Sequence, residues 1–112
     1  MVAQNEVRIA TTEAIFRTVN ERIAESSERF DSESGEFVCE CQDRSCTHRV
    51  EASLDEYEHV RADATHFLLA PGHDNARVER VDQRKRRYWV VEKFERTVAA
   101  TVRRLNPRAR TA

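Results

Sequence analysis

The chain has 112 residues, of which 39% are hydrophobic and 35% are charged, and it contains only two glycines and two prolines. This length suits one domain and excludes two domains of ordinary size. No apolar run approaches the roughly 20 residues that span a bilayer, and residues 1–12 lack the apolar stretch of a secretory signal. We therefore expect a cytoplasmic protein with no membrane partner.

The net charge of −1 conceals a marked asymmetry along the chain. Residues 1–75 contain seven Lys or Arg against 16 Asp or Glu, whereas residues 76–112 contain 12 Lys or Arg against four Asp or Glu. Such a division indicates either two halves that pack together and neutralise each other or two surfaces that bind different partners. The sequence alone leaves both interpretations open.

The first predicted element is a helix from Thr12 to Phe30. Apolar side chains recur there at helical spacing and form its predicted inner face: Ile15, Phe16, Val19, Ile23 and Phe30. Thr11 or Thr12 is expected to cap its start, since a hydroxyl accepts hydrogen bonds from first-turn amides. Residues 31–35, rich in Asp, Ser and Gly, are expected to end it as a loop.

A β-hairpin is predicted for residues 36–52, with its turn at 42–45, because apolar and polar side chains alternate there. Ser53 and Glu56 follow at the spacing of a capping box, in which the serine caps a helix amide and the glutamate reaches back. This box predicts a second helix, whose inner face carries Leu54, Tyr57, Val60 and Ala64.

Three more strands and a terminal helix are predicted for the rest of the chain. Residues 66–70 form a short apolar strand that Pro71-Gly72 ends, and strands at 77–83 and 87–94 are joined around Arg84–Arg86. A short helix containing Val98, Val102 and Leu105 is expected to stop near Asn106-Pro107.

This order of elements favours an α+β fold with a small antiparallel sheet, an N-terminal helix, a metal-bearing hairpin, a second helix and a C-terminal helix. We expect one domain over residues 1–95, followed by a basic C-terminal helix and tail at 96–112.

Three cysteines within eight residues are the most informative motif: Cys39-x-Cys41-x4-Cys46. Two cysteines at i and i+2 of a strand point the same way, and a tight turn can return the third. An odd, clustered set of thiols is unlike a secreted disulfide framework, and the polar residues between them disfavour a purely apolar packing role. Because zinc prefers tetrahedral sulfur and imidazole ligands, the motif predicts a Zn²⁺ site.

Spacing does not decide the fourth ligand. His48 follows Cys46 by two residues, so strand alternation would place it beside the thiols. His73 lies far along the chain but directly follows Pro71-Gly72, which would present it at the tip of a sharp turn. His59 and His66 have the context of ordinary helix and strand residues.

A series of short motifs runs in order along about residues 8–95: Glu13-Ala-Ile-Phe-Arg17, Val19-Asn-Glu-Arg22, Phe37-Val-Cys-Glu-Cys41 with Cys46, Glu56-Tyr57, Val60-Arg-Ala62, Pro71-Gly-His73, Val78-Glu79 and Val90-Val-Glu-Lys93. The series resembles a group of small uncharacterised proteins from actinobacteria and related bacteria. In that pattern the Pro-Gly-His element recurs, whereas the position of His48 is typically not histidine. The resemblance therefore implies His73 as the fourth ligand, with His48 as the alternative, and it implies no activity. The chain departs from the pattern at Gln42, where glycine is usual, and in the basic turn at 84–87.

A site with four protein ligands leaves no position for water, which favours a structural zinc in a regulatory or protein-interaction module over an enzyme. The expected partner is another protein, and no small-molecule substrate is expected.

Two alternative functions are also consistent with the sequence. Nucleic acid could bind the basic residues Arg84, Lys85, Arg86 and Arg87 beside Tyr88 and Trp89, although a pI near 6.4 is low for such a role. The same thiolates could also form a redox sensor that releases zinc on oxidation.

Overall fold

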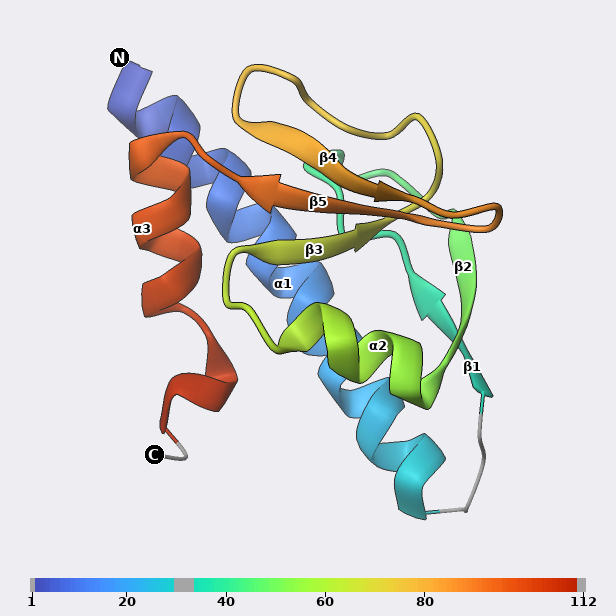
Figure 1. Ribbon diagram of the computed structural model, residues 1–112. Helices are drawn as coiled ribbons and strands as arrows, with labels where there is room; N and C mark the ends of the chain where they lie inside the picture. Colours follow the sequence, from blue (N-terminus) through green and yellow to red (C-terminus); the bar gives the residue numbers. More distant parts are fainter. Residues whose placement is uncertain (1, 30–33, 111–112) are drawn as a thin grey trace.

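The computed structural model describes residues 2–29 and 34–110, and over these residues the chain forms three α-helices and five strands (Figure 1). The helices are α1 (Val2–Arg29), α2 (Leu54–Arg61) and α3 (Arg96–Arg104), and a short 3₁₀ turn follows at Pro107–Arg110. The strands are β1 (Ser34–Val38), β2 (Arg49–Ser53), β3 (His66–Leu69), β4 (Glu79–Arg84) and β5 (Trp89–Lys93). The predicted α+β class is confirmed.

All strand pairs in the described residues are antiparallel and form two small sheets. β1 pairs with β2, with Phe37 opposite Val50, and the second sheet has the order β3–β5–β4. The β4–β5 ladder contains an irregularity between Val81 and Gln83, of the kind that an extra residue produces in one strand. Strand bounds differ from the predicted ones by a few residues, as strand ends commonly do.

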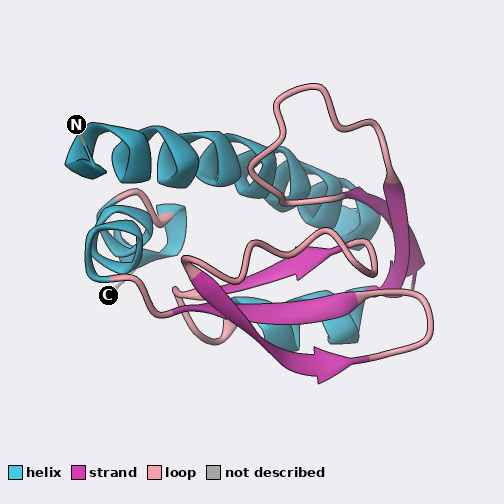
Figure 2. Ribbon diagram, turned by 90° about the horizontal axis from the view of Figure 1, so that it is seen from above, coloured by secondary structure: helices cyan, strands magenta, loops and turns pink. Residues whose placement is uncertain are grey.

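The helices pack around the three-stranded sheet. α1 runs diagonally behind this sheet, which Figure 2 shows from above, and α3 lies beside the N-terminal part of α1. α2 lies next to β3. No helix in the described part of the chain is both long enough and apolar enough to cross a membrane.

The predicted inner face of α1 is mostly wrong, although Ile23 does pack against the core. The residues that α1 buries are polar or small, and most of them repeat at helical spacing: Glu6, Ala10, Thr12, Glu13, Ala14, Arg17, Asn20 and Ala24. Ile15 and Val19, expected inside, are 56% and 40% exposed, and Phe30 lies outside the described residues. The helix also begins at Val2 rather than Thr12, so Thr11 caps nothing and instead donates its hydroxyl to the Val7 carbonyl.

The burial of polar side chains on α1 is possible because the charged ones contact groups from distant elements. Glu13 accepts from the fully buried Lys93 Nζ of β5 at 2.5 Å, and the same ammonium binds Glu79 of β4. Arg17 donates to the carbonyls of Ala64 at 2.9 Å and Val102 at 2.8 Å. Burying a charge is costly unless the group is paired or hydrogen-bonded, so these contacts help to keep the polar face of α1 turned inward.

The apolar core lies between the sheets and the three helices. Phe37 of β1 stacks on Tyr57 of α2 with ring centroids 4.5 Å apart, and both side chains are fully buried. The predicted capping box is confirmed, because Ser53 Oγ accepts from the Glu56 amide at 3.0 Å while Glu56 accepts from the Ser53 amide at 2.8 Å. α2 therefore starts at the residue that the sequence motif predicts.

Acidic and basic halves of the chain meet in ion pairs. Arg108 pairs with Glu21 and Glu58 at 2.7 and 2.6 Å, and Arg87 pairs with Glu51 at 2.6 Å. Together with the Lys93–Glu13 pair, these contacts join residues from either side of position 75. In this fold the charge asymmetry therefore serves, at least in part, to hold the two halves together.

Candidate metal centre

The three cysteine thiols and the His73 ring converge in one cluster. One ligand atom from each of these residues lies within 4.8 Å of all the others. His73 Nδ1 is 3.6 Å from Cys39 Sγ and 3.7 Å from Cys46 Sγ. In a zinc tetrahedron, bond lengths of about 2.3 Å to sulfur and about 2.0 Å to nitrogen place these two ligand types about 3.5 Å apart. The four residues therefore sit at distances that suit a tetrahedral metal ion.

Cys39 and Cys41 lie just beyond β1 instead of within the hairpin strand predicted for them. β1 ends at Val38 and β2 begins at Arg49, so the cysteines belong to the connecting loop. This loop starts in an extended course, because the Glu40 amide donates to the Leu68 carbonyl of β3 at 2.8 Å. Alternation still holds: Cys39 and Cys41 are buried on the metal side, 1% and 3% exposed, with Glu40 between them.

A tight turn returns Cys46 to the cluster. The Cys46 amide donates to the Asp43 carbonyl at 3.0 Å, and the Asp43 carboxylate accepts from the Ser45 amide at 2.9 Å and its hydroxyl at 2.7 Å. The Ser45 contacts hold the pKa of Asp43 below its usual value. Polar residues in this segment therefore build the turn that presents the third thiol.

His73 is positioned by the turn after β3. Its amide donates to the Ala70 carbonyl at 3.1 Å, and Gly72 has a φ of 83°, a conformation that glycine adopts without strain. Proline followed by a glycine at positive φ is typical of a type II turn. The Ala70 amide also donates to Cys39 Sγ at 3.2 Å. Residues 70–73 therefore supply one candidate ligand, His73, and a hydrogen bond to a second candidate ligand, Cys39.

Glu40 is a positioning residue whose function the sequence does not reveal. Its side chain is fully buried and accepts from the Leu68 amide at 2.9 Å, Asn20 Nδ2 at 2.7 Å and the Tyr57 hydroxyl at 3.2 Å. Burial raises the pKa of Glu40, although these hydrogen bonds oppose the shift. Asn20 also bonds both the amide and the carbonyl of Val38, each at 2.8 Å. The backbone on both sides of Cys39 is thus tied to α1, α2 and β3.

The pKa values of Cys39 and Cys41 are shifted in opposite directions. Hydrogen bonding from Cys39, supported by the Asp43 amide and the His73 and Cys46 side chains, lowers the pKa of Cys41 to about 5. Its bond to Cys41 and its burial raise the pKa of Cys39 above the ordinary thiol value. One thiolate is therefore formed readily at neutral pH, and a bound cation would displace the remaining thiol protons.

The other histidines lie outside this cluster. His48 is exposed, and its ring packs edge-on against the His73 ring with centroids 4.4 Å apart. His59 Nδ1 lies 2.8 Å from the Asp55 carbonyl. His66 Nε2 lies 3.8 Å from Asp63 and 3.7 Å from Glu92; these three form a second, more exposed group of possible metal ligands in the described residues. Exposed ion pairs of this kind are common without a metal.

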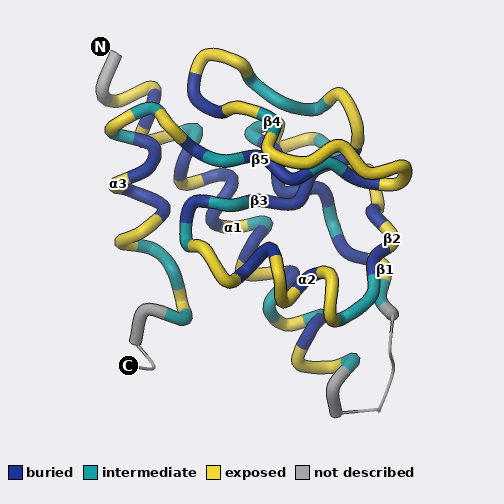
Figure 3. The backbone as a smooth tube through the Cα atoms, viewed as in Figure 1, coloured by how far each residue is buried: buried dark blue, intermediate teal, exposed yellow. Residues whose placement is uncertain are grey.

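The basic residues predicted to contact nucleic acid lie together on the exposed β4–β5 turn: Arg84, Lys85, Arg86 and Arg87 (Figure 3). The aromatic residues beside the turn are already engaged within the fold. Tyr88 is 5% exposed and donates its hydroxyl to Glu56 at 2.9 Å, and the Arg84 guanidinium lies 5.0 Å from the Trp89 ring centroid. The hydrogen bond to Glu56 therefore fixes the position of the Tyr88 ring beside the turn.

Comparisons of the chain with protein-family models, curated proteins and solved structures found no match. The resemblance to small actinobacterial proteins therefore stays an expectation, and the geometry of the cluster carries the functional interpretation.

Proposed function

We propose that the chain is a zinc-binding regulatory or protein-interaction module in which Cys39, Cys41, Cys46 and His73 hold one structural Zn²⁺. The observation that carries this proposal is the agreement between the sulfur–nitrogen distances of 3.6 and 3.7 Å and the edge of a zinc tetrahedron. Three thiols and one imidazole favour zinc over magnesium or calcium, which prefer oxygen ligands.

A structural rather than a catalytic role follows from the ligand count. Four protein ligands complete a tetrahedron and leave no position for a water molecule or a substrate. The ion would also join the loop after β1 to the turn after β3, two segments that are separated along the chain by β2, α2 and β3. Folding and metal binding would then be coupled.

Metal content of the purified protein tests this proposal. Elemental analysis is expected to find one zinc per chain in the wild type and in His48→Ala, and little zinc in His73→Ala. The two variants are a matched pair, because both remove an imidazole and the two rings are in contact. A folded wild type with three titratable thiols and no metal would contradict the zinc site. If His48→Ala loses zinc and His73→Ala keeps it, the fourth ligand is His48.

A redox function is a second candidate, favoured by the unequal exposure of the ligands. Cys46 is half-buried, whereas Cys39 and Cys41 are almost inaccessible. Peroxide would convert the Cys46 thiolate to a sulfenate, and attack by a neighbouring thiolate would then form a disulfide. Overall, two thiolates lose two electrons and peroxide is reduced to two hydroxide ions. The disulfide binds zinc poorly, so the ion would leave.

A further inference from the structure

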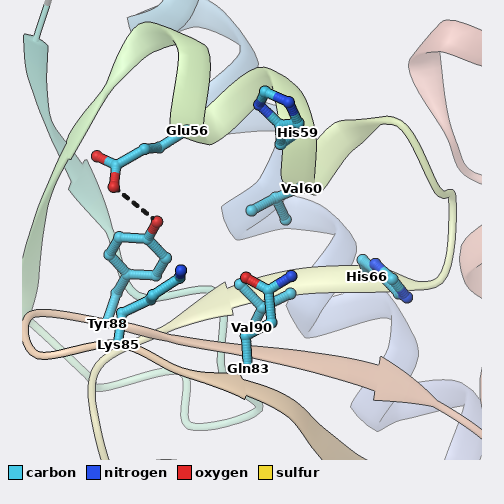
Figure 4. A pocket seen from close by; sticks show the side chains of 8 residues that line it. All are labelled: Glu56, His59, Val60, His66, Gln83, Lys85, Tyr88 and Val90. Atoms are coloured by element: carbon cyan, nitrogen blue, oxygen red, sulfur yellow. Dashed lines mark hydrogen bonds between the residues drawn. The ribbon is translucent and has the colours of Figure 1, made fainter.

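Two adjoining hollows lie between α2 and the β4–β5 hairpin, and Figure 4 shows the side chains of the first. One cavity of about 290 Å³ has Glu56, His59 and Val60 of α2 on one side and Gln83, Lys85 and Tyr88 of the hairpin on the other. A second hollow of about 470 Å³ shares Glu56, Lys85 and Tyr88 with the first and extends to Arg86 and Arg87. We refer to the two together as the α2–hairpin groove. Its volume is in the range of small-ligand sites.

The groove combines an apolar wall with polar ends. Val60 and Val90 are buried and face each other across it, and the Tyr88 ring forms a further part of the wall (Figure 4). The Tyr88 hydroxyl is held by Glu56, so this ring has a fixed position. Such a wall suits the apolar or ring portion of a ligand, while the polar groups around it decide the charge that the ligand carries.

The acidic groups of the groove are already occupied by protein donors. Glu56 accepts from the Ser53 amide with one oxygen and from the Tyr88 hydroxyl with the other. Glu51 pairs with Arg87 at 2.6 Å. Neither carboxylate is therefore well placed to bind a cationic ligand without losing a contact within the fold.

Two cationic side chains of the groove, in contrast, have no side-chain acceptor in the described part of the chain. Among the described residues, no side chain accepts from Lys85 Nζ or from the Arg86 guanidinium, and the charge of Lys85 acts only at longer range to lower the pKa of Glu56. Gln83 adds an amide beside Lys85, and the His59 ring lies on the opposite side (Figure 4). These exposed donors are hydrated in the free protein and are available to a ligand. Beside an apolar wall they favour an anionic ligand with several acceptor oxygens.

We propose that the α2–hairpin groove binds a phosphate monoester or diester, with the phosphate at Lys85 beside Gln83 and the esterified group against Val60, Val90 and Tyr88. Arg86 adds positive charge from the adjoining hollow, which Lys85 also lines. The ester could come from a free small molecule or from a single-stranded nucleic acid whose backbone crosses the basic turn. This proposal differs from the sequence-based expectation that the protein has no small-molecule substrate. It is independent of the metal centre, since neither hollow is lined by a cysteine or by His73.

Titration of the zinc-loaded, isotope-labelled protein with AMP, followed by amide NMR shifts, tests the proposal. AMP is expected to shift amides of residues 56–60 and 83–90, and adenosine, which lacks the phosphate, to bind at least about tenfold more weakly. Lys85→Met is expected to weaken AMP binding about tenfold, as loss of one charged hydrogen bond predicts. Arg104→Met removes an exposed cation on α3 and should leave AMP affinity unchanged.

A single-stranded RNA hexamer distinguishes the two sources of phosphate. Tighter binding of the hexamer than of AMP, lost between low and moderate salt, would assign the groove to a nucleic-acid backbone. Binding of AMP as tight as that of the hexamer would assign it to a free phosphate ester. Absence of shifts in the groove at millimolar AMP, equal affinities for AMP and adenosine, or no effect of Lys85→Met would each overturn the proposal.

Discussion

The Nδ1 atom of His73 lies 3.6 Å from the Sγ atom of Cys39, although 34 residues separate the two in the chain. The contact brings together the loop after β1 and the turn after β3. An ion bound there would close a long loop, and closing such a loop removes conformational freedom mainly from the unfolded chain. We therefore expect chelation of the metal to lower the free energy of unfolding of the whole domain, not only of the loop.

Gly72→Ala tests how closely the turn controls His73. A Cβ at this position meets no atom within 4 Å, so the substitution has no steric cost and acts only through the φ of 83°. Holding a non-glycine residue there costs about 1–2 kcal/mol, which corresponds to zinc affinity about 5- to 30-fold weaker if the metal-free turn relaxes. Competition with a chromophoric chelator measures this affinity. Gly72→Asn should lose less, because asparagine tolerates positive φ; equal affinities in all three proteins would contradict the prediction.

Glu40→Gln and Glu13→Gln form a matched pair of buried substitutions. In Glu40→Gln, an amide nitrogen replaces one acceptor oxygen and must face Leu68 or Asn20, both of which donate. We expect zinc affinity to fall about 10- to 100-fold and the Co²⁺ absorption spectrum to shift, since supporting residues orient metal ligands. Glu13 is equally buried but contacts Lys93, so Glu13→Gln should change stability without changing the spectrum. Identical spectra for wild type and Glu40→Gln would remove the positioning role.

Local spacing predicts those parts of the fold that depend on neighbours in the chain. The capping box at Ser53 and Glu56, the grouping of Cys39 and Cys41 and the turn at Pro71-Gly72 all rest on residues within a few positions of each other. The same alternation along an extended chain places Glu40, which lies between the two cysteines, on the side away from them, where it contacts Asn20.

Long-range pairing explains where the sequence misleads. The inner face of α1 is set by partners far along the chain: Lys93 is 80 residues from Glu13, and Val102 is 85 residues from Arg17. Hydrophobic periodicity cannot detect such pairs, because it scores Glu13 and Arg17 as solvent-facing. For the same reason spacing left His48 and His73 as alternatives, since only the packing of β3 against the cysteine loop brings His73 into the cluster.

Peroxide treatment of the zinc-loaded protein tests the redox candidate. Because Cys46 is the most accessible of the three thiols, we expect it in every early disulfide, with zinc released in proportion and taken up again after reduction. Mass spectrometry of the alkylated protein identifies the disulfide, and a chromophoric chelator follows the zinc. If zinc stays bound and the thiols stay reduced in mild peroxide, the redox function is excluded and the structural function remains.

The pH dependence of stability should reveal the buried Glu13–Lys93–Glu79 cluster. One ammonium lies between two carboxyl groups, so the cluster is neutral only while one carboxyl keeps its proton. Burial, opposed by Lys93 and supported by Glu79, raises the pKa of Glu13 from 4.5 to about 8.

Between these two pH values the native state binds more protons at Glu13 than the unfolded state does. The contribution of Glu13 to stability is therefore fully present below about pH 4.5 and is lost as the pH rises towards 8. Urea unfolding of the zinc-loaded wild type and of Glu13→Gln at pH 5.5 and pH 8 measures this contribution, since glutamine stays neutral and the thiols are common to both proteins. We expect the wild type to lose at least about 1 kcal/mol more than the variant over this interval, because each unit of pKa shift corresponds to about 1.4 kcal/mol. Equal losses in the two proteins would show that Glu13 is ionised in the native state and that the cluster keeps an unbalanced negative charge.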